Sequence, residues 1–166
     1  MGGKDTDIAR QGRGDRLIKE RIHDPYMTRM KLTEPTVCPD CHVVFEGGRW
    51  QWMTPVPTGA NEELCPACRR IRDRVPAGFL TLSGAFFENH REEILNLMQN
   101  KVDAEKRQHP LKRIMGMEEQ DEKLVVTFTD THLPRGVGEA IERAYEGTLH
   151  IHYEPEASII RVVWER

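Results

Sequence analysis

Four cysteines in two closely spaced pairs constrain this chain more than any other feature. Cys38 and Cys41 form one C-x2-C pair, Cys65 and Cys68 form the second, and 23 residues separate the pairs. Each such pair makes a tight turn, and four thiolates from two turns can surround one tetrahedral ion. The spacing therefore predicts one structural zinc ion bound by all four cysteines, with no open position left for a substrate.

Other interpretations of the cysteines stay open at this level. The pairs could form two disulfides or a dithiol redox switch, and iron could take the place of zinc. A redox C-x2-C normally begins a helix inside a β-α-β pattern, which the surrounding sequence does not indicate. No apolar stretch of membrane-spanning length and no secretory signal is recognisable. We therefore expect a cytoplasmic location, where cysteines bind metal more readily than they form disulfides.

Charge and sequence pattern divide the chain into three parts. Residues 1–35 are rich in Gly and Arg and poor in aliphatic residues, which predicts a flexible basic arm. Residues 36–77 form the cysteine module, in which glycine and proline turns predict short strands of a zinc ribbon. The chain up to residue 77 has 13 Lys and Arg against 11 Asp and Glu, whereas residues 78–166 have 11 against 16. Only the first two parts are expected to face a polyanion.

Residues 78–166 show the periodicities of an α/β domain. A strand is predicted over residues 79–87 with a bulge at Gly84, and a helix follows it, capped by Asn89 with Glu92. Two strands, a second helix beginning near Pro134, and two closing strands complete the order β-α-β-β-α-β-β. This order predicts a ferredoxin-like split β-α-β sandwich with one added strand, and hence an α+β chain with a small four-cysteine zinc ribbon in front.

The closing strands are expected to alternate between core and solvent. Leu149, Ile151 and Tyr153 are predicted to face inward, which places His150 and His152 on the solvent face.

Acid–base pairs that could suggest catalysis have simpler interpretations. Glu88 with His90, and Asp130 with His132, each lie at a predicted helix entrance, where such residues serve as caps. No nucleophile, phosphate-binding or metalloprotease motif is recognisable. We therefore expect a protein that is not an enzyme.

Basic and aromatic residues around the cysteines are the candidate RNA-binding residues. Arginines neutralise phosphates, and indole rings offer faces on which unpaired bases stack. The tryptophans could equally cap the small metal-centred core, and the arginines could simply be solvated. The predicted RNA-binding set comprises Arg49, Trp50, Trp52, Arg69, Arg70, Arg72 and Arg74.

The order of these residues carries a family resemblance. The run Cys38-Pro39-Asp40-Cys41, then Arg49-Trp50-Gln51-Trp52, then Cys65-Pro66-Ala67-Cys68-Arg69, followed by an α/β segment, resembles the N-terminal region of the large-subunit nuclear-export adapter family first named for nonsense-mediated decay. It is similar also to small bacterial proteins of the same layout. The resemblance implies a ribosome-binding zinc ribbon joined to an α/β domain. The adapters have further cysteine pairs and an export signal, so nuclear export is not implied.

These observations lead to one functional hypothesis and one alternative. The hypothesis is a non-enzymatic, zinc-stabilised factor that binds the ribosome or ribosomal RNA, in biogenesis, hibernation or translation quality control. The alternative is a protein-binding regulatory adaptor that uses the cysteine module as its docking surface. Neither hypothesis involves a membrane or a small-molecule substrate.

Overall fold

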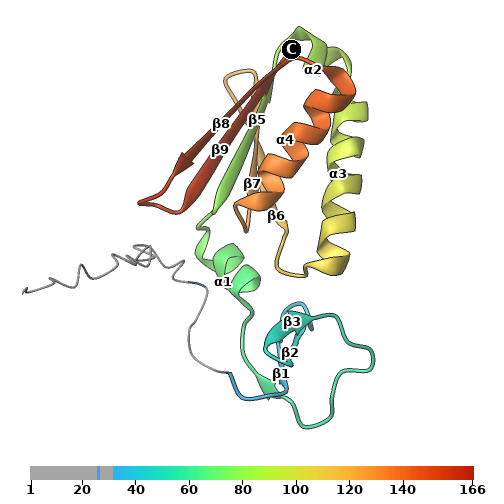
Figure 1. Cartoon of the computed structure of the whole chain (residues 1–166), viewed down its shortest axis with the longest axis vertical. Helices are drawn as coiled ribbons and strands as arrows, with labels where there is room; N and C mark the ends of the chain where they lie inside the picture. Colours follow the sequence, from blue (N-terminus) through green and yellow to red (C-terminus); the bar gives the residue numbers. More distant parts are fainter. Residues whose placement is uncertain (1–25, 27–31) are drawn as a thin grey trace, which may run out of the picture.

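The computed structural model describes Tyr26 and residues 32–166, which form two mixed β-sheets and four helices (Figure 1). The predicted basic arm over residues 1–35 lies mostly outside the described residues. Within the described part of the chain, no helix combines the length and apolar character that crossing a bilayer requires. The predicted α+β class is confirmed.

The cysteine module contains a small four-stranded sheet and one short helix. A tight hairpin joins its second and third strands, because Gly47 and Gly48 adopt φ values of 63° and 78° that favour glycine. The carboxylate of Glu34 accepts hydrogen bonds from both glycine N–H groups, at 3.1 and 2.9 Å. The strands are β1 (Thr36–Val37), β2 (Val44–Glu46), β3 (Arg49–Gln51) and β4 (Asn61–Glu62), in the order β3-β2-β1-β4, followed by α1 (Pro66–Asp73).

The α/β domain is a five-stranded sheet covered on one face by two long helices (Figure 1). β5 and β6 run parallel with β7 between them, which is the predicted split β-α-β unit. The last strand lies inside the sheet, next to and parallel with β5. The elements are β5 (Gly78–Ser83), α2 (Ala85–Asn89), α3 (Arg91–Gln108), β6 (Ile114–Gln120), β7 (Lys123–Phe128), α4 (His132–Tyr145), β8 (Thr148–Glu154) and β9 (Ile159–Glu165), with the sheet order β6-β7-β5-β9-β8.

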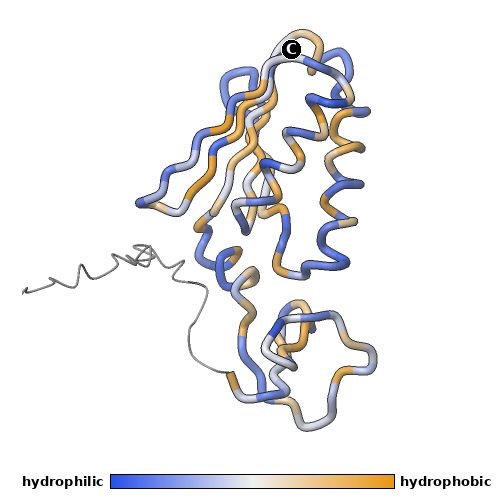
Figure 2. Tube along the Cα trace, in the orientation of Figure 1, coloured by the Kyte–Doolittle hydropathy of each residue, from blue (hydrophilic) through white to orange (hydrophobic). Residues whose placement is uncertain are grey.

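The core forms where α3 and α4 lie on the three central strands. Leu80 pairs in register with Val126 on one side and Val162 on the other, and all three side chains are fully buried. From the helices, Ile94, Met98, Val137 and Ile141 complete the same apolar layer. In Figure 2 the central strands carry much of the hydrophobic colour, whereas α1 and the last turns of α3 are largely hydrophilic. The predicted helical and strand periodicities therefore identify the core face.

The entrance to the first long helix differs from the prediction. The strand ends at Ser83, and the predicted bulge residue Gly84 is the N-cap of the short helix α2, so Asn89 ends α2 instead of capping α3. A Cβ atom on Gly84 would lie 2.3 Å from the Arg166 carbonyl oxygen. That same oxygen accepts the Phe87 N–H at 3.1 Å. A long-range contact with the end of the chain therefore sets this boundary, and local capping signals could not reveal it.

The prediction that Leu149, Ile151 and Tyr153 of β8 face inward is only partly correct. Ile151 and Tyr153 share a face with Val162 and Ile160, but they are 38% and 50% exposed. β8 is an edge strand, and the β8–β9 hairpin projects beyond the helical layer (Figure 1). Only Leu149 packs against the core. His150 and His152 are exposed, as predicted.

The close approach of α4 to the sheet yields a stability prediction. A Cβ on Gly138 would lie 2.7 Å from Val162 Cγ1, whereas a Cβ on Gly136 of the same helix would make only ordinary contact, 3.7 Å from Lys101 Cε. We expect Gly138→Ala to lower the free energy of unfolding by about 1–3 kcal/mol through overpacking. Gly136→Ala should raise it by about 0.5–1 kcal/mol through helix propensity. Urea unfolding followed by circular dichroism measures both, and equal effects would contradict this packing.

Candidate metal centre and adjoining cleft

Both cysteine pairs lie in turns that direct their sulfurs toward one point. Cys38 follows the first strand, and its N–H donates to the Val43 carbonyl at 2.9 Å, which closes the first turn. Cys65 is the N-cap of α1, and its Sγ accepts the Cys68 N–H at 3.3 Å. Pro66 occupies the first turn of this helix, where its missing N–H costs nothing.

The four sulfurs lie at separations suited to one metal ion. All four Sγ atoms are within 4.8 Å of one another. Four sulfurs at ~2.3 Å from a tetrahedral ion are about 3.8 Å apart, and the Cys41 and Cys65 sulfurs are 3.8 Å apart. The distance is far above the ~2.05 Å of a disulfide, and all four cysteines are free thiols. The described residues therefore contain a group that could hold one metal ion.

Hydrogen bonds and burial shift the pKa values of the clustered thiols in opposite directions. The hydrogen bond with Cys65 lowers the pKa of Cys41 to about 4, against the opposing effect of burial. The same contact raises the pKa of Cys65, and burial raises the pKa of Cys68 to about 11. Four buried thiolates would repel one another, so deprotonation of all four requires a positive charge among them.

The second cysteine pair lies at the start of a helix, which the sequence did not indicate. Cys65 caps α1, and Cys68 lies in the first turn of this helix. A helix at a C-x2-C pair is therefore present, although no β-α-β unit surrounds it in the described part of the chain. What favours a metal over a dithiol switch is the convergence of both pairs, because a redox pair needs only two sulfurs.

A positive charge from the α/β domain reaches the cysteines. The guanidinium of Arg113 donates to Cys41 Sγ at 3.1 Å and to Cys68 Sγ at 3.3 Å, with Cys65 Sγ at 3.9 Å. Arg113 is only 7% exposed. Burial alone would lower the pKa of Arg113, but the thiolates more than offset this and raise it, so the group stays charged. Arg113 therefore contacts three of the four sulfurs from outside the cysteine module.

The loop between α3 and β6 holds Arg113 in this position. The Nε of Arg113 donates to the Pro110 carbonyl at 2.8 Å, and the backbone N–H of Arg113 donates to the Thr129 hydroxyl at 2.8 Å. Leu111 from the same loop packs on the cysteine cluster. From the opposite direction, the Trp52 indole N–H donates to the Lys106 carbonyl at 2.9 Å. The two parts of the chain are therefore joined by polar and apolar contacts.

Next to this junction lies a cleft of about 760 Å³, which is called the cleft below. One wall is β3 and the residue after it, with Arg49, Trp50 and Trp52. The other wall is the end of α3 and the following loop, with Arg107 and Lys112. Arg70 and Asp130 also line it. The cleft thus combines indole rings with an excess of basic side chains.

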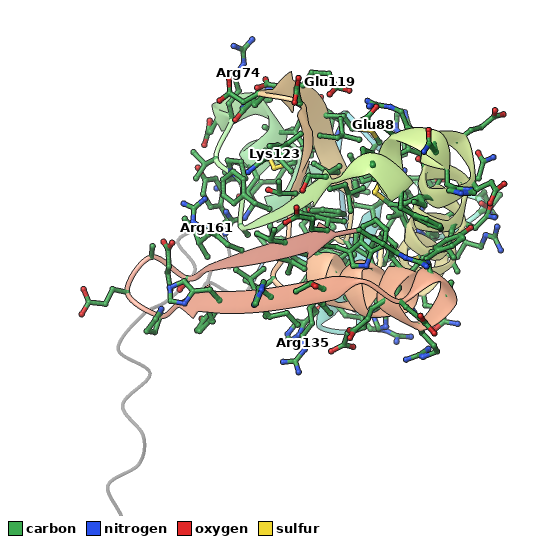
Figure 3. All side chains as sticks on the ribbon, turned by 90° about the horizontal axis from the view of Figure 1, so that it is seen from above. Arg74, Glu88, Glu119, Lys123, Arg135 and Arg161 are labelled. Carbon is green, nitrogen blue, oxygen red and sulfur yellow. The ribbon has the colours of Figure 1, made fainter. Side chains whose placement is uncertain are left out.

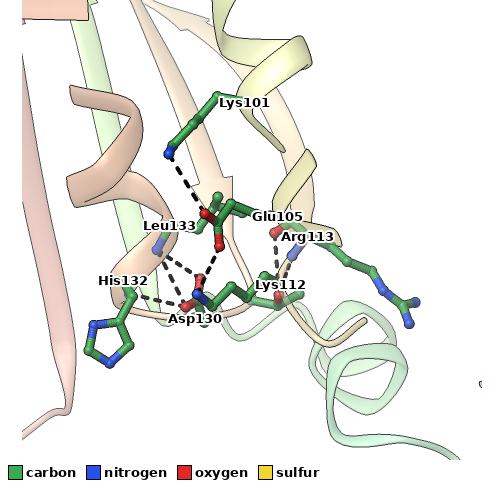
Figure 4. Close-up of polar contacts among 8 residues, drawn as sticks. Lys101, Glu105, Lys112, Arg113, Asp130, His132 and Leu133 are labelled. Carbon is green, nitrogen blue, oxygen red and sulfur yellow. Dashed lines mark hydrogen bonds and ion pairs between the residues drawn. The ribbon is translucent and has the colours of Figure 1, made fainter. Parts of the chain in front are cut away.

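Asp130 and its neighbours have a structural role at the edge of the cleft. The Asp130 carboxylate accepts the backbone N–H groups of His132 and Leu133 at 3.1 Å, which caps α4 as the sequence predicts (Figure 4). Burial raises the pKa of Asp130, and the two backbone donors oppose this shift. Lys112 forms an ion pair with Glu105 at 3.1 Å (Figure 4). The close-up also shows the Arg113 guanidinium directed away from this cluster.

The structure separates the seven predicted RNA-binding residues into two groups. Arg49, Trp50, Trp52 and Arg70 line the cleft, although Arg70 is buried and donates to the Val75 carbonyl. The remaining three arginines lie outside the cleft lining. Arg69 pairs with Glu63 and Arg72 with Asp40, whereas Arg74 ends α1 and projects from the molecule (Figure 3).

Sequence reasoning missed the residues that the α/β domain contributes. The sequence-based prediction of the site includes none of Arg107, Leu111, Lys112 and Arg113. The four-cysteine motif itself could have indicated that another residue contacts the sulfurs, because a four-thiolate site needs hydrogen-bond donors outside its ligand set. That rule predicts a basic residue near the sulfurs, but not which one.

Comparison with family models, curated proteins and solved structures finds no match for this chain. The family resemblance described above is carried by the order of the cysteines, tryptophans and arginines alone. Interpretation of the site therefore depends on its own geometry.

The ligand assignment predicts the effect of removing one sulfur. Cys38→Ser should lose most of the bound metal and unfold the cysteine module, because metal binding supplies most of the stability of so small a unit. The α/β domain has its own core and should stay folded. Elemental analysis and NMR spectra of the variant test this prediction. Full metal content in Cys38→Ser would show that the assignment is wrong.

Replacement of Arg113 should lower the metal affinity of the same site by a smaller amount. Arg113→Met keeps an unbranched side chain but removes the donors to the sulfurs, so metal affinity should fall about 10–100-fold. Competition with a chromophoric chelator measures this affinity. Arg161→Met serves as a control, since Arg161 lies on β9 and pairs with Glu154. Equal metal affinity in all three proteins would contradict the role of Arg113.

Proposed function

We propose that this chain is a zinc-stabilised, non-enzymatic protein that binds RNA in the cytoplasm, on the ribosome or on ribosomal RNA. The observation that carries the proposal is the cleft, in which indole rings and basic side chains from both parts of the chain gather beside the four cysteines. Stacking surfaces combined with positive charge are the common chemistry of single-strand and loop recognition in RNA.

Zinc is the metal that suits the proposed role. Four thiolates form a closed, soft ligand set, which zinc prefers and which leaves no position for a reacting water. A structural ion would hold the β2–β3 hairpin and α1 in fixed positions, so that Arg49, Trp50 and Trp52 are ordered before RNA binds. Preordering of this kind lowers the entropic cost of association. Elemental analysis of the purified protein identifies the ion directly.

The proposal that the RNA is ribosomal is supported by the family resemblance, because the resemblance implies contact with the large subunit. Biogenesis, hibernation and quality control all require such contact. They differ in the stage at which the subunit is bound, so the particle that captures the protein would distinguish them.

A surface of α1 favours the alternative role of protein-binding adaptor. Ile71 and Val75 are 38% and 42% exposed beside Arg74, and a partner could cover them. This surface is small, and it does not explain the basic cleft, so we rank the adaptor role second.

Co-sedimentation tests both roles. The protein should sediment with ribosomes or one subunit at low salt, and a high-salt wash should release it, because phosphate contacts displace counterions that salt restores. Cys38→Ser should stay in the supernatant. Absence of the wild-type protein from every ribosomal fraction would refute ribosome binding. Capture of a protein partner that survives nuclease treatment would favour the adaptor.

A further inference from the structure

The size of the cleft limits what it can hold. Its volume of about 760 Å³ lies within the ~300–1,000 Å³ typical of sites that bury most of a small organic ligand. One unpaired nucleotide, or two, fits a space of this size. A nucleic acid duplex does not, because its bases are paired and stacked inside it. If RNA binds here, it therefore enters as a single strand.

Two arginines on opposite walls of the cleft are available for phosphates. Arg49 on β3 and Arg107 in the last turn of α3 are both exposed. Among the described residues neither side chain has an ion-pair partner, whereas Arg69, Arg72 and Lys112 are each paired with a carboxylate. An arginine whose charge is already compensated gains less from a phosphate than one that faces water. Arg49 and Arg107 are therefore the expected backbone contacts.

The indole of Trp52 is a fixed platform in the same cleft as these arginines. Its N–H is held by the Lys106 carbonyl, one residue before Arg107, and the side chain is still 40% exposed. Trp50 offers less exposed surface for a base, because it packs against the cysteine cluster and lies edge-on to Phe45, at 5.4 Å between ring centroids. A ring that is already ordered loses little entropy when a base stacks on it. Trp52 is thus better placed than Trp50 to accept a base.

Asp130 sets the direction in which a nucleotide would enter. It is the only carboxylate that lines the cleft among the described residues, and two backbone N–H groups already hold it. A phosphate next to this carboxylate would be repelled, whereas the N–H groups of a base would not. The base is therefore expected inside the cleft, and its flanking phosphates at the exposed arginines.

We propose that the cleft takes the base of one unpaired nucleotide of single-stranded RNA on Trp52, with the flanking phosphates held by Arg49 and Arg107. This assignment rests on the proposed RNA-binding function, and it adds the α/β domain as one half of the binding site. Arg69, Arg72 and Arg74 lie outside the cleft lining and contribute only general positive charge.

A matched pair of substitutions tests the assignment. Arg107→Ala removes a cleft arginine from the last turn of α3, and Arg143→Ala removes an arginine from the last turn of α4, where it also has no ion-pair partner among the described residues. Both are exposed, so neither change should unfold the protein. Each variant loses one positive charge from the last turn of a helix. Only the location relative to the cleft differs.

Binding of a fluorescent oligouridine is measured by anisotropy at several salt concentrations. Arg107→Ala and Arg49→Ala should each weaken binding several-fold and lower the slope of log affinity against log salt by about 0.7, which is the loss of one phosphate contact on a single strand. Arg143→Ala should leave the slope unchanged. Trp52→Ala should weaken binding by about 5- to 150-fold, and Trp52→Phe, which keeps a stacking ring, by less.

The outcomes separate this assignment from the broader function. If wild-type protein sediments with ribosomes but does not bind oligouridine, or if Arg107→Ala and Arg143→Ala behave alike, the cleft assignment is wrong and the proposed function survives. A hairpin duplex that binds as tightly as the single strand would also overturn the assignment. If the protein binds neither ribosomes nor any RNA, the proposed function itself is wrong.

Discussion

The arrangement of the two parts of the chain depends on the contact between the Arg113 guanidinium and the cysteine sulfurs. Four thiolates around a divalent cation keep a net charge of about −2, and such a charge is costly inside a protein unless it is compensated. Within the cysteine module, the backbone N–H of Cys68 donates to a sulfur, but this donor is neutral. Arg113 supplies a full positive charge from the α/β domain, at 3.1 and 3.3 Å from two of the sulfurs. Compensation of the site therefore requires the two parts of the chain to be docked.

Docking in turn creates the cleft. Its two walls belong to different parts of the chain, with Arg49 and Trp52 on one side and Arg107 and Lys112 on the other. Neither part alone would place these groups opposite each other. In the proposed function, a structural metal ion would therefore affect RNA binding through the distance and orientation of the two walls of the cleft.

Sequence patterns predicted the parts of this protein that depend on local spacing. The two C-x2-C pairs identified the four clustered sulfurs, and the periodicities of residues 78–166 identified an α/β domain. Features that depend on contacts between distant segments were not predictable. The Arg166 carbonyl decides where α2 begins, the edge position of β8 decides the exposure of Ile151, and the fold of the α3–β6 loop decides that Arg113 meets the cysteines.

Hydrogen exchange of two indole N–H groups tests the central claim most directly. The Trp52 N–H bonds to Lys106 across the junction, and the Trp164 N–H bonds to Glu146 within the α/β domain, at 2.7 Å, which provides an internal control. If the metal site and Arg113 hold the two parts together, chelation of the metal or Arg113→Met should greatly accelerate exchange at Trp52 and leave Trp164 protected. Unchanged protection of Trp52 after complete metal removal would contradict the account.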